Sequence, residues 1–421
     1  MPNSPVRPTP RTADAMGSLR VPAFWLLVGL LLYGAARVGT MVGNAFALYP
    51  VATAVAVGLF ALYAVPFLVF VDRLDYLERE PPLLLATAFG WGGLVATSVA
   101  IPGNAAADSL LAKLGSPAFA ATWGPALTGP TIEEPVKLLG VVVIALIARA
   151  QINSVVDGFV YGALTGLGFQ VVENVLYAAN QVAATGTGDR TGPVLGVFVA
   201  RGFLAGPWSH TLFTALAGAG VGYVVVRRER RRAVRYAVAT LCLAGAWLAH
   251  FAWNSPVLAG GFGLGVPGQV VAVLVKGIPA LVMVLALVRA AGDREADYYA
   301  EVLSRAGDPQ LATPAEIESL RSPAGRSAAR RDAYTRSGHR GAWAVRRLQS
   351  AQARLAVELS RGVDAEPVER RRRDVLAARR RLAALTVCVA PRHRSAAGWV
   401  LGGTVLALLA LGLGLVLRAL G

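Results

Sequence analysis

Long runs of apolar residues follow one another along the chain, separated by short polar segments. A helix that crosses the hydrocarbon core of a bilayer needs about 20 mostly apolar residues. The runs therefore predict an all-α fold, a polytopic transmembrane helix bundle with about nine spans. The predicted spans cover residues 21–43, 47–71, 82–103, 117–148, 157–180, 194–226, 234–255, 267–290 and 397–419.

The fourth run, 117–148, is longer than a single crossing requires. It contains the pairs Gly124-Pro125 and Gly129-Pro130. Proline removes a backbone donor and crowds the preceding turn, so such pairs interrupt or bend a helix. The pattern predicts a tilted helix, or one that is kinked or broken at these positions.

The overall composition agrees with a membrane protein. Hydrophobic residues make up 55% of the chain and charged residues 16%, whereas soluble domains have about 45–50% and about 25%. The formal charge of +16 comes largely from arginines beside predicted spans, at 227–235 and between 291 and 396. Because basic loops mark the cytoplasmic side of a membrane, this charge does not require nucleic acid, and no nucleic-acid partner is expected.

The same charges orient the predicted spans. Placing Arg7, Arg11 and Arg20 in the cytoplasm also puts the arginine-rich loops at 227–235 and 291–396 there. The chain is thus predicted to be a multi-pass cell-membrane protein with a cytoplasmic N-terminus. After the ninth span, the C-terminus is predicted to lie outside.

Composition also divides the chain into parts with different expected roles. These are a disordered cytoplasmic arm (1–20), a transmembrane core of about eight spans (21–290), a basic and largely helical cytoplasmic segment (291–396), and a final span (397–419).

The basic segment 291–396 carries signals of helix. Thr313-Pro314-Ala315-Glu316 matches a capping box with proline at the first helical position. Further helices are predicted near 342–361 and 366–387. The segment is expected to form a helical hairpin or to lie on anionic lipid, and a solvated tether is the alternative.

Ionisable residues occur inside four consecutive predicted spans. At membrane depth such residues are costly and are candidates for a functional site. The polar residues in these spans are Glu133, Glu134 and Lys137, then Glu173 and Asn174, then Arg201 and His210, and finally His250 and Asn254.

Helical rise predicts that these residues meet. At ~1.5 Å per residue, Glu134, Glu173, His210 and His250 each lie roughly 22–25 Å from the nearest cytoplasmic marker. The four helices alternate in direction, so their side chains reach the same depth. The cluster is predicted to lie in the outer half of the bilayer.

A cluster of this kind can activate water. A glutamate beside a histidine can take a proton from water and pass it to a leaving amine. Alternatively, Glu173, His210 and His250 could hold a zinc ion and leave another carboxylate as the base. Both mechanisms use the same residues, so the sequence pattern leaves both open.

Four further residues are predicted to support the site. Lys137 lies three and four residues after the paired glutamates and can hold one of them ionised. Asn174, Asn254 or His250 could stabilise an oxyanion. Arg201 is a further supporting candidate, and a place at the outer interface explains it equally well.

The motifs resemble those of the PrsW family of intramembrane proteases, within the wider group of CAAX-prenyl proteases and bacteriocin-processing membrane proteins. The motifs are Glu133-Glu134-x-x-Lys137, Asp157-Gly158-Phe159-Val160-Tyr161-Gly162 leading to Phe169-x-x-x-Glu173-Asn174, His210-x-x-x-Thr214, and His250-x-x-Trp253-Asn254. They occur in the family's order, and the resemblance covers about residues 60–290.

The resemblance implies a membrane endopeptidase that cuts a membrane-anchored protein such as an anti-sigma factor. It also implies that Glu133, Glu134, Glu173, His210 and His250 form the catalytic group. PrsW proteins are commonly described as metalloproteases, whereas the related prenyl-protein proteases look more like glutamate-dependent enzymes. The resemblance thus leaves zinc as an open cofactor.

Two other classes of protein are compatible with the polar residues. A proton-coupled transporter uses intramembrane carboxylates and histidines as a relay. A non-catalytic scaffold would bind other membrane proteins through 291–396. The order and spacing of the motifs favour the endopeptidase.

Overall fold

The computed structural model describes residues 21–74, 80–360 and 365–386, and almost all of these residues are helical. No β-strand occurs in these ranges, so the predicted all-α class is confirmed. The chain divides into two units, the first ending at Gly292 and the second beginning at Asp293. The predicted arm 1–20 and the predicted span 397–419 lie outside the described residues.

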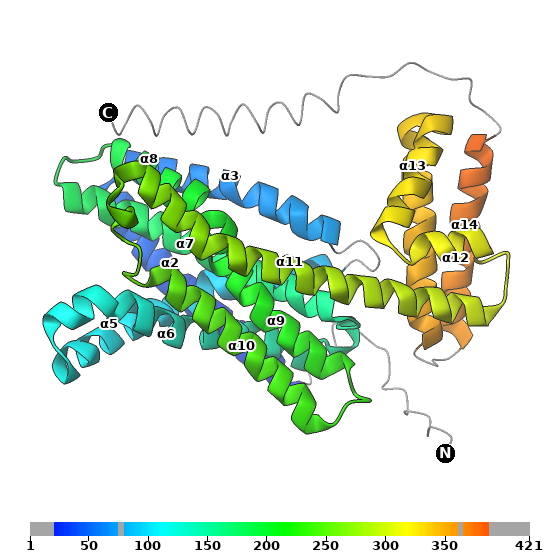
Figure 1. Cartoon of the computed structure of the whole chain (residues 1–421), viewed down its shortest axis with the longest axis horizontal. Helices are drawn as coiled ribbons and strands as arrows, with labels where there is room; N and C mark the ends of the chain where they lie inside the picture. Colours follow the sequence, from blue (N-terminus) through cyan, green and yellow to red (C-terminus); the bar gives the residue numbers. More distant parts are fainter. Residues whose placement is uncertain (1–20, 75–79, 361–364, 387–421) are drawn as a thin grey trace. The chain divides into compact units, whose positions relative to one another are not determined.

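Unit 1 holds most of the long helices (Figure 1). Its elements are α2 (Pro22–Leu48), α3 (Pro50–Leu74), α4 (Pro82–Gly90), η1 (Trp91–Ala96), α5 (Thr97–Leu114), α6 (Pro117–Ile147), η2 (Arg149–Gln151), α7 (Val155–Thr185), α8 (Gly192–Val197), η3 (Phe198–Leu204), η4 (Gly206–Trp208), α9 (His210–Val226), α10 (Arg232–Asn254), η5 (Gly261–Gly263) and the first part of α11 (Gly265–Ala306).

Seven helical segments of the described residues are long and apolar enough to cross a membrane. They are Pro22–Leu48, Pro50–Val71, Pro82–Leu114, Val155–Thr185, Gly206–Val226, Arg232–Asn254 and Gly265–Ala306. Each corresponds to one of the predicted spans, and several extend beyond the predicted ends.

The fourth predicted span forms α6, which is one uninterrupted helix of 31 residues. Pro125, Pro130 and Pro135 lie inside it, so the break expected at the Gly-Pro pairs does not occur. α6 is not among the seven apolar segments, and the charged residues Glu133, Glu134 and Lys137 lie in its middle.

The sixth predicted span, 194–226, is wrong as a single helix. The chain forms a short helix with a π-helical second half, Gly192–Leu204, and then a 3₁₀ turn before α9 begins at His210. Gly206-Pro207 lies at the interruption. Proline at the start of a new helical segment is favoured because its missing N–H needs no partner there.

α7 lies within unit 1 and packs against α3, α4, α6, α8 and α9 (Figure 1). Three of its glycines face α9 at a spacing of four residues. A Cβ atom at Gly158, Gly162 or Gly166 would lie 2.2–2.4 Å from a backbone oxygen of α9. Only glycine permits this approach. Glycines at this spacing in the sequence predict close helix packing, and the structure confirms it.

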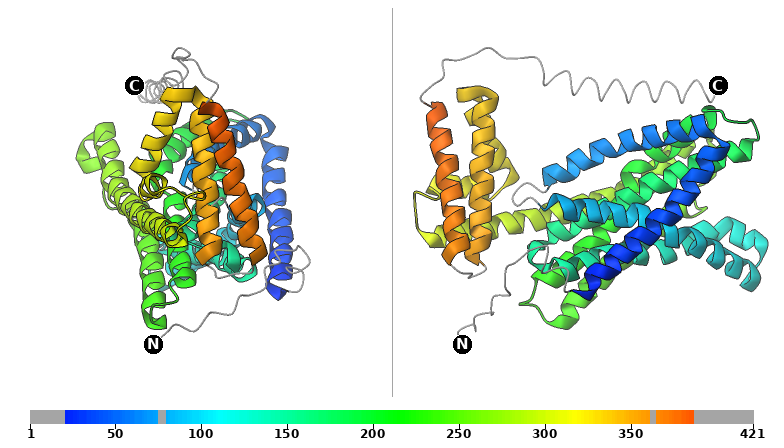
Figure 2. Two further views of the ribbon diagram at one scale, coloured as in Figure 1. Left: turned by 90° about the vertical axis from the view of Figure 1, so that its right-hand side faces the viewer. Right: turned by 180° about the vertical axis from the view of Figure 1, so that it is seen from behind.

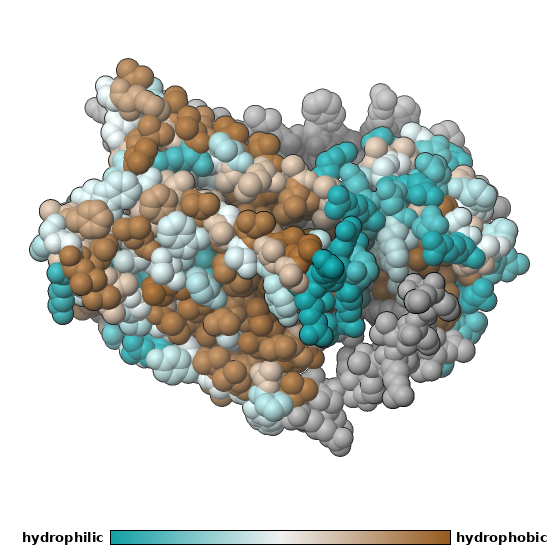
Figure 3. Space-filling view, turned by 60° about the horizontal axis from the view of Figure 1, so that its bottom comes forward, coloured by the Kyte–Doolittle hydropathy of each residue, from teal (hydrophilic) through white to brown (hydrophobic). Residues whose placement is uncertain are grey.

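The outer surface of unit 1 is largely apolar. Leu32, Leu62, Leu241, Leu248 and Val282 are exposed on four of its long helices. Figure 3 shows hydrophobic residues over much of one face of this unit. Water would not favour such a surface, whereas lipid chains would, which agrees with a multi-pass membrane protein.

Unit 2 contains the end of α11 and three further helices, α12 (Pro314–Leu320), α13 (Pro323–Ser360) and α14 (Ala365–Thr386). The predicted capping box is confirmed, with Thr313 and Glu316 bonded to each other's backbone amides. α13 and α14 lie side by side (Figure 2), as expected for a helical hairpin. Arg379 of α14 donates a hydrogen bond of 2.6 Å to Glu316 of α12 and so links these two helices.

Candidate active site

The predicted site residues of four helices converge inside unit 1, as their depth along the sequence predicted. The donor atoms of two glutamates of α6 and two histidines, of α9 and α10, lie within 4.8 Å of one another. These four residues, Glu133, Glu134, His210 and His250, are all buried. Glu173 of α7 and Lys137 of α6 contact the same group.

Lys137 lies at the centre of this cluster. Its Nζ atom is 2.6 Å from Glu134 Oε1, 3.3 Å from Glu133 Oε2 and 3.0 Å from His210 Nδ1. It also lies over the ring of Phe169, 4.4 Å from its centroid. Since the side chain has no exposed surface, its charge is balanced by the two carboxylates alone.

The contacts of His210 determine which of its ring nitrogens carries the proton. A lysine ammonium has only donors, so Nδ1 must accept from Lys137. Nε2 lies 3.0 Å from Glu173 Oε2, so it donates to that carboxylate. Both ring nitrogens of His210 therefore have partners within the protein.

His250 has the opposite arrangement. Its Nδ1 lies 2.8 Å from Glu134 Oε1 and donates to this carboxylate. In the neutral ring, Nε2 is the nitrogen without a proton, and the carboxylate oxygen Glu133 Oε2 lies 4.0 Å from it. Among the described residues Nε2 makes no hydrogen bond, so it is the ring nitrogen available for chemistry.

Besides His210, Glu173 contacts Arg201, one of the residues predicted from the sequence to support the site. Arg201 donates to the carboxylate of Glu173 and, at 2.6 Å, to Oδ1 of Asn174. Its guanidinium also stacks on the ring of Tyr177. Arg201 lies in the π-helical η3. This distorted helix therefore positions the guanidinium that binds Glu173, and Glu173 in turn binds His210.

Asn254 is the supporting residue least engaged with the cluster. Its side-chain amide donates to the carbonyl oxygen of Pro125 at 2.9 Å. Its Nδ2 also lies near Gly129, on the α6 turn before Glu133. Asn254 therefore faces the cluster from the end of α10 without bonding to a carboxylate.

Three contacts were missed by the sequence analysis. Asn104 donates to Glu133 Oε1 at 2.9 Å; it lies one residue beyond the predicted span 82–103, whereas α5 continues to Leu114. Thr214 donates to Glu134 Oε2 at 3.3 Å, one turn after His210. Phe169 contacts Lys137, and its place one turn before Glu173 was the available signal.

The interrupted span sets the position of His210. Gln170 of α7 accepts hydrogen bonds from Thr211 and donates to Tyr63 at 2.6 Å and to the Gly206 carbonyl at 3.4 Å. This buried amide fixes both ends of the turn before α9. His210 is consequently the first residue of α9 rather than a residue in the middle of a span.

Comparison with known proteins identifies the family. A family model described as PrsW family intramembrane metalloprotease matches residues 80–287. This part of the chain belongs to the PrsW family. The match contains every candidate site residue, and the chain is accordingly an intramembrane protease, with a peptide substrate in the membrane. Searches of curated proteins and of solved structures found no match.

The PrsW family implies a metal, and the donor set agrees with one. Two carboxylates and two imidazoles within 4.8 Å are the oxygen and nitrogen ligands that zinc accepts. The candidate metal ligands in the structure thus include Glu133 and Glu134, whereas the metal ligands predicted from the sequence included Glu173 as the carboxylate. The ammonium of Lys137 contacts three of the four residues, so a metal ion at this point requires Lys137 to move aside.

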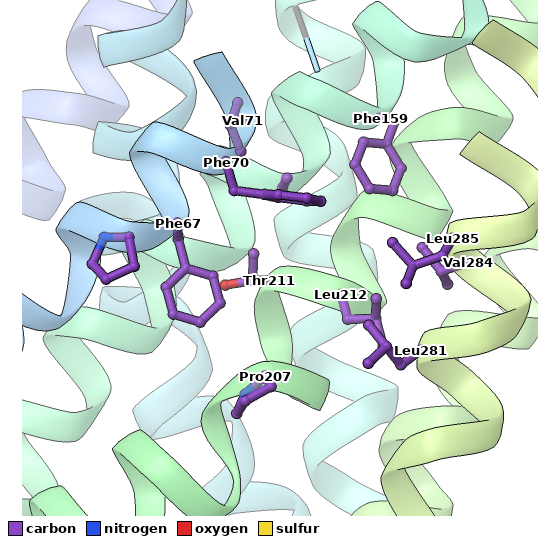
Figure 4. Close-up of a pocket in the computed structure, with 12 residues that line it drawn as sticks. Phe67, Phe70, Val71, Phe159, Pro207, Thr211, Leu212, Leu281, Val284 and Leu285 are labelled. Carbon is purple, nitrogen blue, oxygen red and sulfur yellow. The ribbon is translucent and has the colours of Figure 1, made fainter. Parts of the chain in front are cut away.

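An apolar groove lies beside the site. It has a volume of about 230 Å³ and is bordered by α3, α7 and α11, with the start of α9 and the turn before it. In Figure 4 Phe67 and Phe70 lie on one side, and Leu281 and Leu285 on the other, with Pro207 and Thr211 between them. Thr211 follows His210 directly in the chain, so the groove reaches the segment that carries the catalytic candidate.

Proposed function

We propose that this PrsW-family protein hydrolyses a peptide bond of a membrane-anchored protein with water activated by Glu133 and His250. The observation that supports this most directly is the free Nε2 of His250 beside the carboxylate of Glu133, both buried. The other histidine, His210, uses both ring nitrogens within the protein. From the sequence, His210 is expected to act with the Glu133/Glu134 pair, whereas these contacts favour His250.

The remaining charged residues position these two. Glu134 accepts the hydrogen bond of His250 Nδ1 and so fixes the neutral ring in the tautomer whose Nε2 carries no proton. Lys137 neutralises both glutamates of α6. Glu173, held by Arg201, fixes His210, which in turn orients Lys137. These residues therefore affect the reaction by positioning Glu133 and His250.

The reaction needs one proton transfer in each direction. Glu133 takes a proton from water while the water oxygen bonds to the substrate carbonyl carbon. The C–N bond then breaks, and Glu133 returns the proton to the departing amine nitrogen, so that one water is consumed for each bond cut. A zinc ion held by Glu134, His210 and His250 would leave Glu133 free as the base and would polarise the substrate carbonyl as a Lewis acid.

The groove of Figure 4 supports a substrate that comes from within the membrane. Its lining is almost entirely apolar, and the lining residue Thr211 directly follows His210 in the chain. Apolar side chains of a transmembrane segment would fill it at no cost in buried polar groups. A membrane-anchored regulator such as an anti-sigma factor is the substrate class that the family resemblance suggests.

Charge supports a topology with a cytoplasmic N-terminus and an external C-terminus. The loop between α9 and α10 contains Arg227, Arg228, Arg230 and Arg231. Burial and the neighbouring Arg149 and Arg235 lower the pKa of Arg228, so this end of unit 1 concentrates positive charge. Anionic lipid headgroups would neutralise it, as they would the arginine-rich helices of unit 2.

The function is tested in cells that express the full chain. New N-termini in membrane proteins are mapped by mass spectrometry for the wild type and for the Glu133→Gln, His250→Asn and Glu229→Gln variants. We expect cuts in or beside transmembrane segments for the wild type and for Glu229→Gln, whose residue is exposed in a loop. Loss of these cuts in the other two variants supports the proposal, and an unchanged set of cuts in both contradicts it.

A further inference from the structure

The two carboxylate oxygens of Glu133 have different partners. Oε2 faces the charged cluster, 3.3 Å from Lys137 Nζ, 3.6 Å from His210 Nδ1 and 4.0 Å from His250 Nε2. Oε1 instead accepts a hydrogen bond of 2.9 Å from the side-chain amide of Asn104. Asn104 lies in α5, a helix that contains none of the site residues predicted from the sequence. One oxygen of the carboxylate is thus bonded to α5, and the other faces the histidines.

This division of partners fixes the orientation of the carboxylate. The last torsion of a glutamate side chain has a broad, roughly two-fold preference, so the side chain alone does not set the plane of its two oxygens. An ionised carboxylate oxygen only accepts, so Asn104 must present an N–H group to it. With Oε1 held by Asn104, Oε2 is the oxygen left on the side of His250 Nε2, where the proposed reaction takes a proton from water.

The other end of the Asn104 amide is not bonded. Its Oδ1 atom is buried and accepts no hydrogen bond from the residues that the structure describes. A buried acceptor without a partner lowers stability, which offsets part of what the bond to Glu133 adds. The net effect of this amide on the stability of the fold is therefore small, whereas its effect on the orientation of Glu133 is direct.

A second polar contact joins the same two helices one turn further along α5. Asp108, four residues after Asn104, accepts a hydrogen bond of 2.8 Å from the hydroxyl of Thr128 of α6. This contact does not involve Glu133. It therefore links α5 to α6 independently of Asn104, and it shows what a purely structural contact between these helices would be.

We propose that Asn104 is a positioning residue for peptide-bond hydrolysis, because its amide holds Oε1 of Glu133 and so directs Oε2 to the reacting water. The inference rests on the proposed function, since it takes Glu133 as the base. Asn104 acts through Glu133 and lies outside the apolar groove assigned to the substrate. Its loss should therefore lower kcat and leave KM unchanged, because the interaction matters in the transition state and not in substrate binding.

Asn104→Leu is the direct test, because leucine is close to asparagine in size and donates no hydrogen bond. The full-length variant is purified into lipid nanodiscs, and initial rates are measured on a membrane protein found to be cut in cells. We expect kcat to fall by about 10- to 100-fold, as when a catalytic group is displaced by up to about 1 Å. We expect KM and the melting temperature to stay close to those of the wild type.

Thr128→Val is the matched control, since it removes the hydroxyl from the other contact between α5 and α6 and leaves Glu133 bonded to Asn104. We expect its kcat to equal that of the wild type. A loss of kcat in Asn104→Leu that Thr128→Val does not share supports the inference. Losses of kcat that follow the melting temperature equally in both variants overturn it, because Asn104 would then act only as a link between helices.

A second variant covers the case in which Asn104→Leu does not fold. Asn104→Asp keeps the shape of the side chain, and in its ionised form it has no N–H group for Glu133. Wild-type kcat in Asn104→Asp, or in a folded Asn104→Leu protein, overturns the inference and leaves the proposed function intact. Absence of cuts from the wild type itself overturns the proposed function, and the inference with it.

Discussion

Lys137 carries a positive charge at the place where the glutamates and His210 meet. Its Nζ is 2.6 Å from Glu134 and 3.0 Å from His210. In this position the ammonium neutralises the carboxylates as a metal ion would, with one charge instead of two. Lysine and metal therefore compete for the same oxygen and nitrogen atoms.

Lys137→Met tests this competition. Removing one partner of a buried ion pair typically costs about 3–5 kcal/mol, because the other partner stays charged. The variant should melt well below the wild type in chelator, and zinc should raise its melting temperature more than that of the wild type. Lys113→Met, at the end of α5, is the control. An equal zinc-induced rise in melting temperature for Lys137→Met and the wild type would contradict competition between Lys137 and the metal ion.

The paired glutamates should differ in what they contribute. Glu134 bonds to Lys137, His250 and Thr214, so Glu134→Gln should lower the free energy of unfolding by about 3–5 kcal/mol. Glu133 has weaker contacts, and Glu133→Gln should lower it by only about 1–2 kcal/mol. Both should abolish cleavage. Chemical unfolding of the two purified variants measures the difference, and a larger loss for Glu133→Gln would refute this division.

At the residue scale, sequence spacing predicted the pairing of Lys137 with both glutamates because three and four residues are one helical turn. It did not predict which histidine keeps a free nitrogen. That depends on Lys137 meeting His210 and on Glu134 meeting His250, residues more than 70 positions apart. Such contacts depend on how the helices pack against one another, and residue spacing within one helix gives no information about that packing.

At the scale of elements, the contact between α7 and α9 places His210. A Cβ atom at Gly166 would lie 2.2 Å from the carbonyl oxygen of His210 and 2.9 Å from Cα of Thr211. The absence of a side chain at Gly166 thus sets how closely the start of α9 approaches α7.

Gly166→Ala should push these helices apart. Overpacking of this kind costs about 1–3 kcal/mol, and a displacement of about 1 Å in a catalytic group can reduce the rate about 100-fold. We expect lower stability together with lower cleavage. Gly43→Ala, with no atom within 4 Å, is the control. A Gly166→Ala protein as stable and active as the control would show that the contact does not position His210.

The glycine spacing in α7 allowed a close helix contact to be predicted, but it did not predict the break in the helix before His210. Residues 194–226 form one long apolar run, and hydropathy does not distinguish a continuous helix from an interrupted one. Gly206-Pro207 was the available local signal. Conversely, the Gly-Pro pairs in α6 did not break the helix, which runs uninterrupted from Pro117 to Ile147.

At the scale of the whole molecule, the all-α class followed from the apolar runs, and the family motifs pointed to proteolysis. The apolar groove could not be foreseen, since it is formed by α3, α7, α9 and α11 together. Each of its lining residues reads in sequence as an ordinary lipid-facing or packing residue.

Filling the groove tests its role in substrate binding. Leu285→Trp adds an aromatic ring from the half-exposed wall on α11, so the fold should be unaffected. We expect weaker cleavage with an unchanged melting temperature. Leu248→Trp, on the exposed face of α10, should cleave normally. Equal cleavage by both variants would show that the substrate does not use this groove.

The central claim is that the buried glutamates and histidines cut peptide bonds rather than carry protons. Purified wild-type and Glu133→Gln proteins are placed in liposomes with a membrane protein found to be cut in cells and with a pH-sensitive dye inside. The account predicts cleavage by the wild type only, with no proton flux above that of empty liposomes. Proton flux that depends on Glu133, without cleavage, would contradict it.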